Sequence, residues 1–179
     1  MILTQKETML LQDLKTQEQV CIEKYNQYAE RANDPKLSQL LRTISSAEQQ
    51  HLSTLEQMEK GTVPAMGGGQ KQPFQPPASA PASAVSPQGK QQDAYLCQDL
   101  LATEKHVSSV YNTGIFEFKD AGMRDALNHI QKEEQEHGKK LYDYLSQNGM
   151  YWFLPQRRAA RAGARKGPAR APRYSASQS

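Results

Sequence analysis

The sequence of 179 residues is short of several features that would assign it to a common class of protein. It contains two cysteines, which form no Cys-x-x-Cys pair and are too few for a metal centre held by cysteine alone. No apolar run approaches the roughly 20 residues that cross a bilayer, so we expect no membrane-spanning helix. The N-terminal residues, MILTQKETMLLQDL, lack the basic, apolar and small-residue zones of a signal peptide. We therefore expect a protein that is made in the cytoplasm and kept inside the cell that makes it.

Acidic residues are missing from two long segments. Residues 62–91 contain none and are rich in Pro, Ala, Gly, Ser and Gln. Such a composition buries too little apolar surface to fold, so it predicts a disordered linker. The last 24 residues hold seven Arg or Lys and no acid, which predicts a basic, disordered tail over 151–179. Residues 1–155 carry all 19 acidic and 15 of the 22 basic residues, a net charge of −4, opposite in sign to the tail.

The first 61 residues are patterned as a helical hairpin. Thr4 and Glu7 form the sequence of a capping box, and apolar residues then follow at helical spacing. Asp34 and Pro35 suit the N-cap and first position of a second helix, which should end at Gly61. Residues 92–150 repeat this plan, with a helix from about Gln92 to Phe118 and a second one that Asp120 caps and Asn148-Gly149 stops. Each helix of about 25 residues should be ~38 Å long.

The two hairpins are copies of one pattern with an offset of 86 residues. A Glu, a Tyr seven residues later and a Glu-x-x-His motif thirty residues after the first Glu recur in both. The members are Glu18, Tyr25, Glu48 and His51 in the first copy and Glu104, Tyr111, Glu134 and His137 in the second. Apolar and capping positions keep the offset, as in Leu14 with Leu100 and Asp34 with Asp120. Because one copy of about 55 residues is too short for a sturdy domain, we expect both to fold as one all-α, four-helix bundle.

The repeated Glu and His residues lie on the apolar stripes of their helices, so they should face the core. Buried carboxylates without partners repel one another and cost several kcal/mol each in desolvation. Two divalent cations would balance four of them, with neutral imidazoles as the remaining donors. This is the ligand set of a dinuclear site in a four-helix bundle, and it predicts metal ligation by Glu18, Glu48, His51, Glu104, Glu134 and His137. Carboxylate-rich ligation with one imidazole per ion favours iron or manganese.

Other acidic residues and histidines do not fit this ligand pattern. The repeat maps Glu133 and Glu136 onto Ala47 and Gln50, so we expect both to be surface charges. We also expect solvated side chains where no acidic counterpart completes a core site, and exposed histidines off the apolar stripes. The former are Glu7, Glu23, Glu30, Glu56 and Glu59, and the latter are His106 and His129. Cys21 and Cys97 fall at apolar positions, which favours buried thiols over a disulfide.

Tyr25 and Tyr111 admit two interpretations. Both lie on the apolar stripes and could be core aromatics. Their fixed distance from a candidate ligand also fits a phenol that donates a hydrogen bond to the Glu of the opposite hairpin and so positions that carboxylate, which makes them candidate catalytic residues. The sequence leaves both interpretations open.

The length of the linker bears on topology. A short connection would force the second and third helices to be antiparallel neighbours. Some 30 residues, at up to ~3.3 Å each, can instead cross a helix length of ~38 Å with slack. The linker therefore permits the crossover topology of a ferritin-like bundle.

Two resemblances follow from these residues. The segment LLQDLKTQEQVCIEKYNQYAERA with the later EQQH resembles the first half of a rubrerythrin-type diiron domain of the ferritin-like superfamily. More closely, DPKLSQLLRTISSAEQQHLSTLEQM and MRDALNHIQKEEQEHGKKLYDYLSQNGMY resemble the coat F family of bacterial spore coat proteins. The resemblance to the ferritin-like superfamily implies the same six metal ligands. The resemblance to the coat F family implies a structural protein of the spore coat, made in the mother cell. The cysteine-ligated iron domain of rubrerythrin and the fifth helix of storage ferritin have no counterpart here.

The leading hypothesis is a ferritin-like spore coat protein with two iron or manganese ions, contributing to coat structure or oxidative protection. One alternative is a dimetal oxidoreductase that reduces peroxide or dioxygen, and another is a metal-free coat component with an electrostatic docking tail. Expected partners are other spore coat proteins or further copies of this chain, with no small organic cofactor and no membrane. A nucleic acid is not favoured, because the basic tail has almost no aromatic residues.

Overall fold

A computed structural model describes residues 2–63 and 85–151. These residues form four α-helices and no strand: α1 (Gln5–Arg31), α2 (Pro35–Glu59), α3 (Pro87–Ile115) and α4 (Ala121–Gln147). The all-helical prediction is therefore confirmed for this part of the chain. Most of the predicted linker, and nearly all of the predicted tail, lie outside the described residues. None of the four helices is both long and apolar enough to cross a membrane.

The helix ends follow the sequence signals. The Thr4 hydroxyl accepts a hydrogen bond from the Glu7 backbone N–H, and the Glu7 carboxylate accepts one from the Thr4 backbone N–H, which completes the capping box. Asp34 and Asp120 are the N-caps of α2 and α4. Gly61, beyond the end of α2, has a φ of 77°, a left-handed conformation that favours glycine.

Helix α3 differs from the prediction at both ends. The sequence predicted a linker up to residue 91 and a helix from about Gln92, but the helix begins at Pro87. The Ser86 side chain accepts a hydrogen bond from the Gly89 backbone N–H, and proline at the first helical position has a pre-set φ. The helix ends at Ile115 rather than Phe118, yet the Phe118 side chain is still buried in the core.

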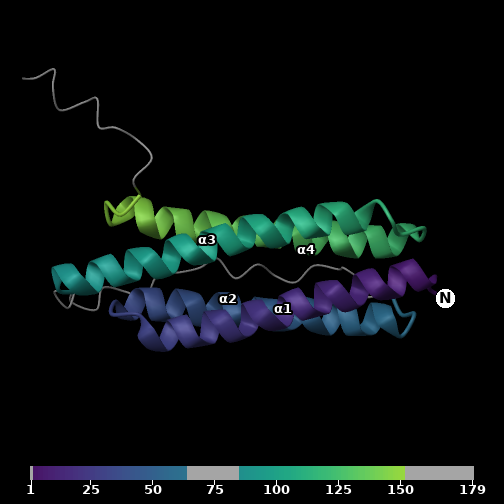
Figure 1. The fold of residues 1–179 in the computed structure, drawn as a ribbon, viewed down its shortest axis with the longest axis horizontal. Helices are drawn as coiled ribbons and strands as arrows, with labels where there is room; N and C mark the ends of the chain where they lie inside the picture. Colours follow the sequence, from purple (N-terminus) through teal and green to yellow (C-terminus); the bar gives the residue numbers. More distant parts are fainter. Residues whose placement is uncertain (1, 64–84, 152–179) are drawn as a thin grey trace, which may run out of the picture.

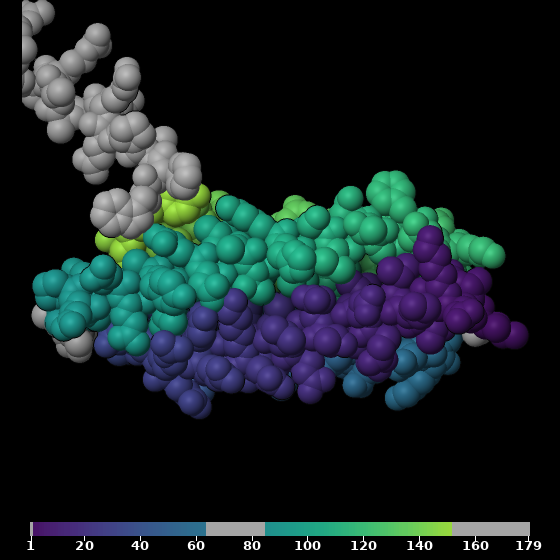
Figure 2. Space-filling view, viewed as in Figure 1, coloured from purple at the N-terminus to yellow at the C-terminus, as the bar shows by residue number. Residues whose placement is uncertain are grey.

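The helices pack as two antiparallel hairpins laid against each other (Figure 1). Helix α1 contacts α2 and α3, while α4 contacts α3 and α2. The end of α2 and the start of α3 lie at opposite ends of the bundle, so α2 and α3 run in the same direction (Figure 1). Figure 2 shows α1 and α3 side by side along one face of the molecule. The end of α2 and the start of α3 are thus separated by the length of the bundle (Figure 1).

The core lies between the hairpins and is built from the repeated apolar positions. Fully buried aliphatic side chains include Leu11, Leu41, Ile44 and Leu55 from the first hairpin and Leu100, Leu127, Ile130 and Leu141 from the second. Burying one such side chain contributes about 2 kcal/mol. Cys21 and Cys97 are buried and form no disulfide, as the sequence predicted.

Glu7 is a correction to the sequence analysis, which placed it in solvent. Its side chain is 5% exposed, and its Oε1 accepts a hydrogen bond from the Lys119 backbone N–H at 3.0 Å. Its counterpart at the offset of 86 is an acid after all, Asp93, which is fully buried. Asp93 accepts hydrogen bonds from the backbone N–H groups of Asn33 and Asp34 at 2.8 and 2.9 Å. The two carboxylates therefore satisfy backbone donors in the loops between helices.

Candidate metal centre

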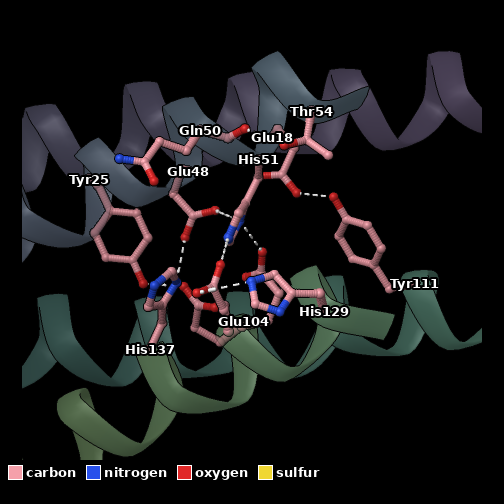
Figure 3. A network of polar contacts seen from close by, with 12 residues as sticks. Glu18, Tyr25, Glu48, Gln50, His51, Thr54, Glu104, Tyr111, His129 and His137 are labelled. Carbon is pink, nitrogen blue, oxygen red and sulfur yellow. Dashed lines mark hydrogen bonds and ion pairs between the residues drawn. The ribbon is translucent and has the colours of Figure 1, made fainter. Parts of the chain in front are cut away.

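All six predicted ligands lie together inside the bundle. Figure 3 labels Glu18, Glu48, His51, Glu104 and His137 among them. Glu18 comes from α1, Glu48 and His51 from α2, Glu104 from α3, and Glu134 and His137 from α4. Each of these residues is at most 2% exposed. The helical period explains the convergence, because a Glu and a His three residues apart share one face of a helix.

The six residues form two overlapping groups. One comprises Glu18, Glu48, His51 and Glu134, and the other Glu48, Glu104, Glu134 and His137. In each group, one candidate ligand atom from every residue lies within 4.8 Å of the others. Glu48 and Glu134 belong to both groups. Two shared carboxylates and two unshared Glu–His pairs can hold two ions side by side.

The histidines turn their Nδ1 atoms toward the carboxylates. His51 Nδ1 lies 3.2 Å from Glu48 Oε2 and 3.0 Å from Glu134 Oε1. His137 Nδ1 lies 2.9 Å from Glu48 Oε1. The two rings stack with their centroids 5.7 Å apart. Both imidazoles can therefore offer Nδ1 to a cation that the carboxylates share.

The outer nitrogen of His51 has a partner that the sequence analysis missed. His51 Nε2 lies 2.9 Å from Glu133 Oε2, and the Glu133 side chain is 31% exposed rather than free in solvent. Glu133 was expected to be a surface charge, because its counterpart at the offset of 86 is Ala47. For the same reason, the contact has no equivalent in the other half of the repeat. The available signal was its position on α4, beside Glu134. A carboxylate behind a ligating histidine fixes the ring orientation and raises its basicity.

Tyr25 and Tyr111 each contact a candidate ligand of the opposite hairpin. The Tyr25 hydroxyl donates a hydrogen bond to Glu104 Oε1, and the Tyr111 hydroxyl donates one to Glu18 Oε1. The rings approach the cluster from opposite sides (Figure 3). Burial raises the pKa of both phenols well above the ordinary value, so they stay protonated as donors. These are the contacts expected if each tyrosine donates a hydrogen bond to a Glu of the opposite hairpin.

Three carboxylate oxygens of the cluster are left without partners. Among the described residues, the buried side-chain atoms that lack a hydrogen-bond partner are Oε2 of Glu18, Glu104 and Glu134. Burial raises the pKa of Glu18 and Glu134 to about 7, and it raises that of Glu104 well above the usual range. Orphaned, buried carboxylate oxygens are costly unless a cation or a proton satisfies them. The residues present therefore fit a pair of metal ions.

The two histidines differ in electrostatic environment. Burial lowers the pKa of His137 to about 4, which keeps its imidazole neutral as metal ligation requires. Burial also acts to lower the pKa of His51, but hydrogen bonds to Glu133, Glu134 and other carboxylates outweigh it and raise that pKa well above its ordinary value. The surroundings therefore shift the pKa of the two imidazoles in opposite directions.

Comparison with known proteins finds a family match in the second hairpin. Residues 92–154, which include most of α3 and all of α4, match the family model of the Coat F domain. The chain is also similar to the uncharacterized protein YusN of Bacillus subtilis (strain 168), with 32% identity over 73 residues. That match covers 41% of this chain and 66% of the relative. No solved structure matches the chain significantly.

Proposed function

We propose that this protein is a ferritin-like component of the bacterial spore coat that binds two iron or manganese ions in the core of its helical bundle. The observation that carries the metal proposal is the pair of overlapping ligand groups, which contain three buried carboxylate oxygens without partners. The match of residues 92–154 to the Coat F domain supports the coat assignment. The parallel course of α2 and α3 supports a ferritin-like connectivity.

Each candidate ligand has a distinct position in the proposed site. Glu18 and His51 would hold one ion, Glu104 and His137 the other, and the two carboxylates common to both groups would lie between them. The four negative charges of the carboxylates balance the charge of two divalent cations. Iron or manganese in such a site supplies one-electron chemistry toward peroxide or dioxygen. The chain itself contributes the two tyrosine hydroxyls, whose hydrogen bonds hold the carboxylates of Glu18 and Glu104 in position.

In the coat, the expected partners are other coat proteins or further copies of this chain. The basic residues beyond Pro155, opposite in charge to residues 1–155, suit contact with acidic surfaces that weakens with salt. An oxidant-consuming enzyme is the second candidate, and the tyrosine hydrogen bonds to unshared carboxylates favour it. Consumption of hydrogen peroxide by metal-loaded protein, against the same protein treated with chelator, separates the enzyme from a purely structural metal protein.

Metal stoichiometry tests the proposal. Protein purified without chelator and loaded with Fe(II) or Mn(II) should contain two ions per chain by elemental analysis. Glu134→Gln should reduce the content more than Glu18→Gln, because Glu134 belongs to both ligand groups and Glu18 to one. Glu23→Gln is the matched control, since this exposed carboxylate lies on α1 outside both groups. A content below about half an ion per chain in the unmodified protein would overturn the metal site.

A further inference from the structure

An open pocket between α3 and α4 reaches the candidate metal centre from one side. It has a volume of about 470 Å³, and two residues of the cluster, Glu104 and Glu134, are part of its lining. Both carry one of the unpartnered Oε2 atoms. Ser108 and Gly138 also line it, and Tyr142 and Tyr151, whose rings meet edge to face at 4.7 Å, form part of its wall.

The equivalent face of the first hairpin has a smaller pocket that stops short of the cluster. Its volume is about 340 Å³, and the described residues that line it include Ile22 and Leu52 but neither Glu18 nor Glu48. Glu18 is fully buried, whereas its counterpart Glu104 keeps 2% exposure. The two halves of the repeat therefore differ in how closely a surface pocket approaches the carboxylates.

Two of the lining positions at which the halves differ carry smaller side chains in the second hairpin. At the offset of 86, Gly138 replaces Leu52 and Ser108 replaces Ile22. A Cβ atom at Gly138 would lie 3.5 Å from Leu101 Cδ1 and 3.6 Å from Glu104 Cβ, so alanine fits there in ordinary contact and a longer side chain would extend into the pocket. Glycine within a helix costs about 1 kcal/mol relative to alanine. Helix stability alone would therefore favour alanine over glycine at position 138.

We propose that the α3–α4 pocket is the route by which small anions enter and bind at the Glu104–His137 side of the metal centre, and that the α1–α2 face is closed. The proposal rests on the proposed metal site. Lys105 adds positive charge to the pocket lining, which favours anions over neutral molecules of the same size. Lys139 also lines the pocket and forms an ion pair with Asp143 at 2.6 Å. Glu104 and Glu134 lie where an entering ligand would meet the ions.

Azide binding to iron-loaded, oxidised protein tests the route, with azide-to-iron charge-transfer absorption as the readout. Gly138→Leu, which copies the residue of the closed side, should raise the dissociation constant at least about tenfold while the iron content stays at the unmodified level. Gly138→Ala should change it by less than about threefold, since one methyl group fits. Ser53→Leu is the matched control, because it adds the same bulk to the pocket of the first hairpin and should leave azide binding unchanged.

Two results would overturn the route: Gly138→Leu protein that keeps its iron and binds azide normally, or weaker azide binding in Ser53→Leu protein. If Gly138→Leu does not fold, Ser108→Ile decides by the same criterion. Unmodified protein that retains no iron after loading contradicts the metal site itself, so the two failures are distinguishable.

Discussion

Glu7 and Asp93 occupy equivalent positions in the two hairpins, and each accepts hydrogen bonds from the loop between the helices of the other hairpin. Glu7 receives the backbone N–H of Lys119, and Asp93 receives those of Asn33 and Asp34. Buried backbone donors need such partners. The hairpins are therefore joined at both ends of the bundle as well as at the cluster in its middle.

Glu7→Gln should lower the free energy of unfolding by about 1–3 kcal/mol at pH 7, because hydrogen bonds to a buried carboxylate become weaker bonds to a neutral amide. Hydrogen bonds from Lys119 and Thr4 lower the pKa of Glu7 below its ordinary value near 4.5. Its contribution is therefore present above pH 4.5 and lost as pH falls through the lowered pKa. Urea denaturation at pH 7 and at about pH 3 should show the difference between variant and unmodified protein shrink. Glu30→Gln, an exposed change on the same helix, should have no effect at either pH.

Metal-free protein should become less stable as pH rises from about 5 to 7. Burial raises the pKa of Glu18 and Glu134 from 4.5 to about 7, so the folded form keeps protons that the unfolded chain has released. Each such carboxyl contributes its full stabilisation at pH values below its pKa in the unfolded chain. That contribution is lost as the pH rises through its pKa in the folded protein. His137, with its pKa lowered to about 4, acts in the opposite sense, but two carboxyls outweigh one imidazole.

Thermal melts in chelator across this pH range measure the trend. Metal-loaded protein is the control, because ions that bind only the folded form replace the protons and should remove the decline. Melting temperatures of chelated protein that stay flat or rise with pH would contradict the prediction.

Glu133→Gln should weaken metal binding about 10- to 100-fold without abolishing it, because the variant loses the charge that orients His51 but no ligand. Competition with a chelator of known affinity measures the change. Asp125→Asn, another exposed acid on α4, controls for net charge and should leave the affinity unchanged. Equal effects of the two substitutions would show that Glu133 acts only through its charge at a distance.

Tyr25→Phe should keep both ions but destabilise the metal-free protein by about 1–3 kcal/mol, since Glu104 Oε1 would lose its buried donor while the ring still fills its space. Tyr111→Phe should do the same at Glu18. Because the two contacts lie on opposite sides of the cluster, the double variant tests whether they are independent. Equilibrium urea denaturation of the four proteins gives these energies, and unchanged stability of both single variants would contradict a structural role for the hydroxyls.

The internal repeat predicted more of this molecule than propensity alone. It placed the six Glu and His residues on core-facing stripes, because identical residues at a fixed offset share an environment. It left the cross-hairpin contact of Tyr25, which the structure shows, as one of two interpretations. The same reasoning failed where the halves differ. Glu133 has no acidic counterpart, and Glu7 corresponds to Asp93, so identity at the offset of 86 marks neither residue. The start of α3 was missed because the cap at Ser86 lies within a segment whose composition indicated a linker.

Both candidate ligand groups take members from both hairpins: Glu134 completes the group of Glu18 and His51, and Glu48 completes that of His137. An ion in either group would therefore hold the two hairpins together, and its binding free energy would add to the free energy of docking one hairpin on the other. The hairpins are covalently joined only through residues 60–86. The second hairpin of a neighbouring chain can present the same carboxylates as the hairpin of the same chain. Two molecules that exchange hairpins would thus be closed by the same ions, with every ligand in its original place.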